Sequence, residues 1–263
     1  MANKNNALAL IEDSSRFLPA QQDIETVMAD LGDILSRRIF GVITIAGGGA
    51  GVFKVLEPGA EETTNGVQAI EGVILASHLV NVRWGHDFGT RQPGERPLCR
   101  SMDGLTGVEE ETGETHSCAA CPFNQFGDDG QRKACSNKRQ LYIMREGDLL
   151  PMLLSLPPSS LKAYDNYRVL ASLTLRAPMN ALVTRITLKN KTSAGGSEYS
   201  SPVFTAIGRL PAEEGKRMEA FARQIMDAAQ RAGISADEND TEGTAPAQPG
   251  GFVQVDDDEL PFT

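Results

Sequence analysis

The chain has 263 residues, enough for one large domain or two small ones, and its composition of 40% hydrophobic and 23% charged residues is typical of a globular protein. No apolar run reaches the roughly 18 residues that a membrane-spanning helix needs, and acidic residues interrupt the apolar stretch near the N-terminus, which argues against a secretory signal. We therefore expect a cytoplasmic protein that does not bind membranes.

The formal net charge of −10 is distributed unevenly along the chain. Residues 237–263 contain eight acidic and no basic groups, whereas residues 131–191 contain eleven basic and three acidic groups. A basic middle followed by an acidic end predicts contact with nucleic acid through the basic part. The alternative is that residues 1–130, with nine basic and nineteen acidic groups, compensate the basic segment within the fold.

Hydrophobic periodicity and turn residues predict a mainly β body. Residues 1–20 are weakly patterned and are interpreted as a flexible N-terminal arm. Helices are predicted over 24–35, 161–173 (after a serine N-cap) and 211–232. Strands are predicted over 42–45, 52–56, 67–84, 141–144, 181–189 and 198–207. The stretch 67–84 is long enough for one bent strand, or for two strands with Gly72 as a bulge.

Residues 85–135 are poor in Val and Ile and rich in Gly, Asp, Glu and Cys, so this segment cannot order itself by burying apolar surface. The four cysteines of the chain all fall in it, with the spacing C-x18-C-x2-C-x13-C: Cys99, Cys118, Cys121 and Cys135. The C-x2-C pair places two thiolates on one turn, and two further thiolates complete a closed tetrahedral shell. We predict a structural Zn²⁺ in a subdomain at about 95–138, with His116 as an alternative to Cys99.

Single-stranded DNA is bound by basic groups that contact phosphates and by aromatic rings that stack on bases. The candidate DNA-binding residues are Arg132, Lys133, Lys138, Arg139, Tyr142, Arg145, Arg168, Arg185, Lys189 and Trp84. Further candidates for stacking are Phe123, Phe126, Tyr164 and Tyr167. The alternative for each residue is a structural role, in which the rings belong to the core and the basic groups to a solvated face.

Sequence motifs for catalysis are missing from the chain. The run Gly47–Gly51 resembles a phosphate-binding loop, but the Lys-Ser/Thr that completes a P-loop does not follow it, so a hairpin turn is expected. There is no Gly-x-Ser-x-Gly and no His-Glu-x-x-His. We expect that the protein is not an enzyme; the alternative is a zinc hydrolase or nuclease with an open coordination position.

From residue 235 the chain is acidic and rich in Gly and Pro, which is typical of a disordered linker. Its last residues are Asp256, Asp257, Asp258, Glu259, Leu260, Pro261, Phe262 and Thr263. This run resembles the acidic tip of bacterial single-stranded DNA-binding proteins. The resemblance implies that residues 256–262 bind replication and recombination proteins, with the apolar side chains as anchors. In that family the Phe is the last residue, whereas here Thr263 follows it.

The body, with a zinc segment inside a basic β domain, is similar in architecture to the zinc-containing helix-destabilising proteins of bacteriophages. The resemblance implies an α+β, mainly β fold: an elaborated OB-fold-like barrel over 21–234 with an inserted zinc-bound loop subdomain, flanking helices and a disordered tail over 235–263.

We therefore expect a non-sequence-specific single-stranded DNA-binding protein for DNA replication, recombination and repair. It is expected to be encoded by a phage or mobile element, to reside in the bacterial cytosol or a phage-infected host, and to be capable of self-association on DNA. The alternative is an annealing or recombination mediator, or a replication or transcription adaptor, whose main role is protein docking.

Overall fold

The computed structural model describes residues 8–9, 11, 15–17, 40–86, 96–126, 133–193 and 196–231. The predicted helix over 24–35, the candidate Arg132 and the acidic tail over 235–263 lie outside these residues. Within the described part of the chain, no helix is long and apolar enough to cross a membrane.

The described strands form one mixed sheet. They are β1 (Val42–Ile45), β2 (Phe53–Leu56), β3 (Thr64–Val67), β4 (Ala69–Arg83), β5 (Cys99–Ser101), β6 (Thr106–Glu109), β7 (Thr115–Ser117), β8 (Cys135–Met144), β9 (Met152–Leu156), β10 (Leu182–Thr192) and β11 (Glu198–Arg209). Their order is β3-β2-β1-β9-β8-β4-β5-β6-β7, and β10 pairs with both β4 and β11. Among these pairings β1 with β9 is parallel and the others are antiparallel.

Two long helices accompany the sheet, α2 (Pro158–Val169) and α3 (Ala212–Arg231). The short helical segments are η1 (Ser15–Phe17), η2 (Pro122–Asn124), the π-helical η3 (Leu170–Leu175) and η4 (Met179–Ala181). Helix α3 agrees with the predicted span. Helix α2 begins earlier than predicted, and its N-cap is Pro157, not a serine. Pro158 lies in the first turn, where the N–H group that proline lacks is not needed.

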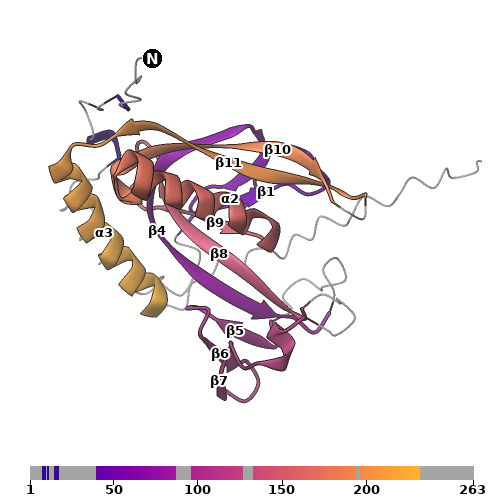
Figure 1. Ribbon diagram of the computed structural model, residues 1–263. Helices are drawn as coiled ribbons and strands as arrows, with labels where there is room; N and C mark the ends of the chain where they lie inside the picture. The colour runs from indigo at the N-terminus through magenta and orange to yellow at the C-terminus, as the bar shows by residue number, and fades with distance from the viewer. Residues whose placement is uncertain are drawn as a thin grey trace, which may run out of the picture.

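Strand β4 connects the parts of the sheet (Figure 1). Its first residues pair with β10, its last residues pair with β5, and β8 runs along its other edge. The register with β8 shifts between Ile74 and Ala76, which bends the strand. Gly72 has a different role: a Cβ there would lie 2.5 Å from the carbonyl oxygen of Met144. Of the two predicted alternatives one bent strand is correct, and its bulge lies after Gly72.

Side chains of β8 alternate between two cores, so the sheet is covered on both faces. One face packs against α2 in a cluster that includes Ile43, Phe53, Ile74, Leu141, Ile143, Leu154, Tyr164 and Tyr167. The other face packs against α3 in a cluster that includes Val73, Tyr142, Met144, Met218, Phe221 and Ile225. The apolar side chains of α3, which recur at helical spacing, therefore form its buried face.

The described positions of the N-terminal arm lie against the body rather than free of it. Phe17 is buried in the cluster under α3, and Ala9 and Ile11 make backbone hydrogen bonds with Arg209 at the end of β11. Phe17 and Ile11 have apolar partners at these positions, and the flexible arm over 1–20 stays a prediction.

Beyond the body, β4 and β8 continue together as a ribbon, formed by residues 77–83 and 135–141. Residues 139–141 also pair with β9, and residues 81–83 also pair with β5. Strands β5, β6 and β7 lie at its far end (Figure 1). The prediction of a mainly β protein is confirmed. The strand pairings of the described residues form an open path with a branch at β4, and the OB-fold barrel stays a prediction.

Candidate metal centre and nucleic-acid interface

The four cysteines line one small pocket at the far end of the ribbon. Cys99 begins β5 and Cys135 begins β8, and the two flank Arg83 of β4, one on each side. Cys118 and Cys121 lie on the turn that follows β7. All four thiols are free. The register of three strands thus brings together cysteines that are far apart in the sequence.

His116 lines the same pocket, with Glu109 next to it. The Nε2 of His116 is 3.6 Å from the Sγ of Cys99, and its Nδ1 is 3.9 Å from the Oε1 of Glu109. One ligand atom from each of these three residues lies within 4.8 Å of the others. A Cβ at Gly107 would lie 2.7 Å from the Nε2 of His116 and 3.1 Å from the Sγ of Cys99, so glycine leaves the room that both side chains occupy.

Two sets of metal ligands are present, the four thiols and the group Cys99, Glu109 and His116. Both oxygens of Glu109 already accept hydrogen bonds from Nη2 of Arg83, at 3.2 and 3.0 Å. A carboxylate engaged in this way is a poorer ligand than a thiolate for a soft divalent cation. The four thiols are therefore the better set, with His116 close enough to take the place of Cys99.

The protonation of the thiols depends on what occupies the pocket. Burial, with added repulsion from the charges of Glu109 and Cys118, raises the pKa of Cys99 to about 11. Burial also raises the pKa of Cys135 to about 11, with added repulsion from the other three cysteines. Thiols with so high a pKa are protonated at neutral pH unless a cation stabilises the thiolate.

Asparagine side chains hold the knuckle, defined as residues 118–124, on the ribbon. The Nδ2 of Asn124 donates to the carbonyl oxygen of Cys118 at 2.9 Å. The Nδ2 of Asn137 donates to the Oδ1 of Asn124 at 2.9 Å and to the Oδ1 of Asn81 at 2.7 Å. These bonds join the knuckle to both strands of the ribbon, so its position is set by the sheet.

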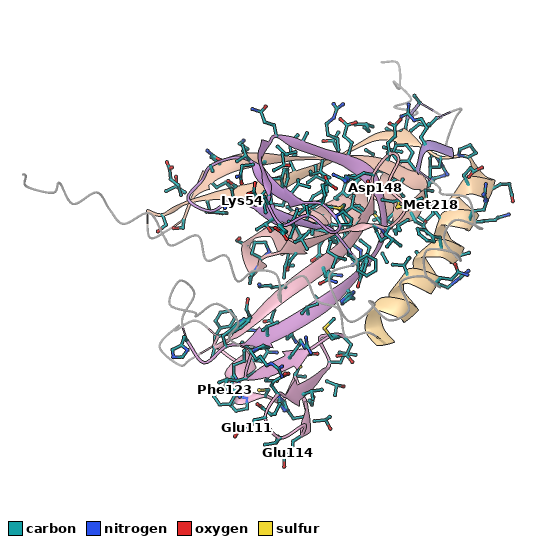
Figure 2. The ribbon with its side chains drawn as sticks, turned by 180° about the vertical axis from the view of Figure 1, so that it is seen from behind. Lys54, Glu111, Glu114, Phe123, Asp148 and Met218 are labelled. Atoms are coloured by element: carbon teal, nitrogen blue, oxygen red, sulfur yellow. The ribbon has the colours of Figure 1, made fainter. Side chains whose placement is uncertain are left out.

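Two exposed phenylalanines, Phe123 and Phe126, are called here the phenylalanine pair. Phe123 lines the cysteine pocket (Figure 2). Phe123 is 46% exposed and Phe126 is 70% exposed. The guanidinium carbon of Arg83 is 4.1 Å from the ring centroid of Phe123, and the Nζ of Lys133 is 4.9 Å from that of Phe126. Each ring therefore makes a cation–π contact and remains largely open to solvent.

The predicted DNA-binding residues on or next to the ribbon are Trp84, Lys133, Lys138 and Arg139. Side chains alternate along β8, so Arg139 shares a face with Asn137 and Lys138 lies on the opposite face. The Arg139 side chain is 15% exposed, lies over the ring of Tyr164 at 5.6 Å and is 3.9 Å from Asp165. Arg139 is thus mostly buried beside a carboxylate, and the two basic side chains lie on opposite faces of the ribbon.

The other predicted DNA-binding residues that the structure describes lie in the body: Tyr142, Arg145, Arg168, Arg185 and Lys189. Arg145 donates to both oxygens of Glu57, at 2.9 and 2.7 Å. Arg185 faces Glu71 on the neighbouring strand, with its Nε 2.6 Å from the carboxylate. These two arginines are neutralised within the fold, whereas Lys189 is exposed on β10.

The three tyrosines considered for base stacking belong to the core. Tyr142 and Tyr164 are 1% exposed and Tyr167 is 3% exposed. Tyr142 packs edge-on against Phe40, and Tyr167 stacks on Phe204 with ring centroids 5.6 Å apart. Their rings offer no free face to a base, so this part of the prediction is corrected. The phenylalanine pair, which was named only as a further candidate, is the exposed aromatic surface.

The sequence analysis missed Arg83, Glu109 and the two asparagines Asn81 and Asn137. Arg83 lies in the acidic first half of the chain and meets Phe123 and Glu109 only through the fold. The one signal in the sequence is its place at the end of a predicted strand, directly before the cysteine-containing segment.

No protein-family model matches the chain, and no curated protein and no solved structure is significantly similar to it. The function is therefore inferred from the geometry of the phenylalanine pair, the ribbon and the cysteine pocket.

Proposed function

We propose that the protein binds single-stranded DNA without sequence preference and that the phenylalanine pair stacks on its bases. The supporting observation is that both rings are exposed while each has a basic side chain on it. Leaving a phenylalanine in water forgoes about 1.5–3 kcal/mol of burial, and stacking a base on a ring contributes about 1–3 kcal/mol. Every base has a π-face, so such contacts tolerate any sequence.

Basic side chains around the pair are assigned to the phosphates of the same strand. Lys133 is the nearest, because its ammonium group lies over Phe126 and also donates to the Oδ1 of Asn137 at 3.2 Å. Lys138, on the opposite face of β8 from Arg139, extends this charge along the ribbon. In duplex DNA the bases are already stacked on each other, so the proposed interface favours single strands.

We also propose that Cys99, Cys118, Cys121 and Cys135 hold a structural Zn²⁺. Four sulfur donors on a C-x2-C turn and two strand ends are the ligands that a closed zinc site uses. The chemistry of the ion would be structural: it would hold β5, β8 and the knuckle together in a segment with little apolar surface to bury. Phe123 is part of that knuckle, so the metal centre would support the DNA interface.

The C-terminal residues 256–262 are proposed to recruit replication, recombination and repair proteins. This assignment rests on the resemblance of the acidic and apolar tip to that of bacterial single-stranded DNA-binding proteins. The aspartates would steer the tip to a basic surface, and Leu260 and Phe262 would fill an apolar pocket of the partner.

The test is a titration of the protein with fluorescently labelled oligo-dT, with a duplex of equal length as a comparison. The variant Phe123→Ala/Phe126→Ala is titrated beside wild type. We expect wild type to bind the single strand well above the duplex. For the variant we expect the dissociation constant to rise about tenfold or more, because two stacking contacts are lost.

The matched control is Leu173→Ala, which removes another exposed apolar side chain, 74% exposed, from the segment after α2. It should bind oligo-dT as wild type does. If wild type does not bind oligo-dT even at low salt, the proposed function is wrong, and a role as a protein-docking adaptor becomes the better account. If the phenylalanine variant binds as wild type, the interface lies elsewhere on the molecule.

A further inference from the structure

We propose that Arg83 is a positioning residue of the DNA interface: it supports one face of Phe123, so that the opposite face is presented to a base, and it does not itself bind phosphate. The inference rests on the proposed function, since it concerns how the same interface is organised. It also assigns Glu109 as the residue that holds Arg83 in place.

Arg83 is enclosed by two partners. Its guanidinium carbon lies 4.1 Å from the ring centroid of Phe123, and its Nη2 donates to both oxygens of Glu109. Its side chain is only 17% exposed. A phosphate would therefore have to displace a carboxylate that already binds the guanidinium, whereas the side chain of Phe123 is 46% exposed.

Glu109 is itself held by the cysteine pocket. It pairs with Cys99 across β5 and β6, and its backbone N–H donates to the carbonyl oxygen of Glu114 at 2.9 Å. Its carboxylate faces the ring of His116, whose other nitrogen faces Cys99. A continuous chain of contacts thus runs from Cys99 through His116, Glu109 and Arg83 to the stacking ring.

Lys133 differs from Arg83, although both lie on a phenylalanine. The polar contact that the described residues give its ammonium group is with the neutral side chain of Asn137. Its charge is therefore not neutralised by a carboxylate of the described residues and is free to act on a phosphate. Arg83 therefore supports the ring of Phe123, whereas Lys133 supplies a positive charge for a phosphate.

The first test compares Glu109→Gln with Glu111→Gln. Both remove one negative charge from the β6–β7 hairpin, but Glu111 is exposed at its outer end (Figure 2). On charge alone, both variants should bind oligo-dT slightly more tightly, because a carboxylate near a polyanion has been removed. If Glu109 positions Arg83, Glu109→Gln binds about tenfold more weakly, as expected from the loss of one stacking contact. Binding by Glu109→Gln as tight as that of Glu111→Gln would overturn the proposal.

The second test measures how binding depends on salt for Arg83→Gln and Lys133→Gln. Each phosphate contact on a single strand contributes about 0.7 to the slope of log K against log salt. We expect Arg83→Gln to weaken binding about tenfold with the wild-type slope, and Lys133→Gln to lower the slope by about 0.7. A lower slope for Arg83→Gln would show that Arg83 binds phosphate, which contradicts the inference.

Zinc content per chain is measured for every variant. If Glu109→Gln loses metal, Arg83→Gln carries the test, because it leaves the cysteines, His116 and Glu109 unchanged. Failure of wild type to bind oligo-dT would overturn the proposed function and this inference together. Wild-type binding with an unaltered affinity of Arg83→Gln would overturn this inference alone.

Discussion

A half-buried histidine illustrates how a single side chain responds to its surroundings. His78 lies in the first part of the ribbon, and its ring is tilted against Tyr142 with the centroids 5.6 Å apart. Neither ring nitrogen has a hydrogen-bond partner among the described residues. Burial, together with the nearby charge of Arg139, lowers the pKa of His78 to about 4. The folded protein therefore holds this histidine neutral.

This pKa gives a pH dependence of stability with a defined sign. The folded-state pKa lies below the value of 6.5 of an unperturbed histidine, so the unfolded chain binds the proton first as the pH falls. The contribution is fully present above pH 6.5 and is lost between pH 6.5 and about 4, by up to about 3 kcal/mol.

Urea denaturation at pH 7 and pH 5 measures this effect. We expect wild type to lose more stability than His78→Gln over this interval, since glutamine does not titrate. Equal losses in the two proteins would show that His78 is protonated in the fold.

At the scale of residues, the spacing of the cysteines was sufficient to predict that they meet, because a C-x2-C turn has only a few geometries. The partners of Arg83 were not predictable, since cation–ring and ion-pair contacts between distant segments leave no local pattern. Tyr142 was taken for an exposed ring because it lies in a basic stretch. Alternation on β8 instead points it into the core under α3.

At the scale of elements, hydrophobic periodicity predicted the helices and strands that bury one apolar face. Helix α3 and the first half of β10 follow apolar patterns that match their buried faces, whereas the buried residues of β11 include Ser200 and Ser201. Strands β5, β6 and β7 were missed, because each is short and the segment offers few apolar side chains. Their pairing follows from the cysteine pocket and the end of β4, which no local pattern reveals.

Strands β5, β6 and β7 give a prediction about the proposed Zn²⁺. Replacing Cys135 by Ser removes one proposed ligand at the start of β8. We expect the zinc content to fall well below one ion per chain, and amide hydrogen exchange to speed up in β5, β6 and β7 while α3 and β11 keep their protection, because those elements pack in a separate core.

The matched control is Ser117→Ala, at an exposed residue next to Cys118. It should keep both the zinc and the slow exchange. Stoichiometric zinc in Cys135→Ser would mean that this thiol is not a ligand, and would point to His116 or Glu109 in its place.

For the whole molecule, the distribution of charge along the chain has more influence on the attraction of DNA than the net charge has. Residues 237–263 carry eight acidic groups and no basic ones, so a chain that ends at residue 236 has a net charge of −2 in place of −10. The basic ribbon and a polyanion attract each other, and a tethered anionic tail competes with that attraction.

We expect the chain ending at residue 236 to bind oligo-dT severalfold more tightly than wild type at low salt, with the difference shrinking as salt screens the tail. The control Phe262→Ala keeps all eight charges and should bind DNA as wild type does. An unchanged affinity of the shortened chain at low salt would show that the tail does not compete for the DNA surface.

Strand β4 has a consequence for the order in which the chain folds. Pairing Arg83 with Cys135 requires residues 84–134 to form a closed loop, and the entropic cost of closing a loop rises with its length. The proposed ion, held by Cys99 and the knuckle, would divide that loop into shorter segments. Capture of the metal and pairing of β4 with β8 would then be a single cooperative event, and the four cysteines that line the pocket would shorten the slow search for distant strands.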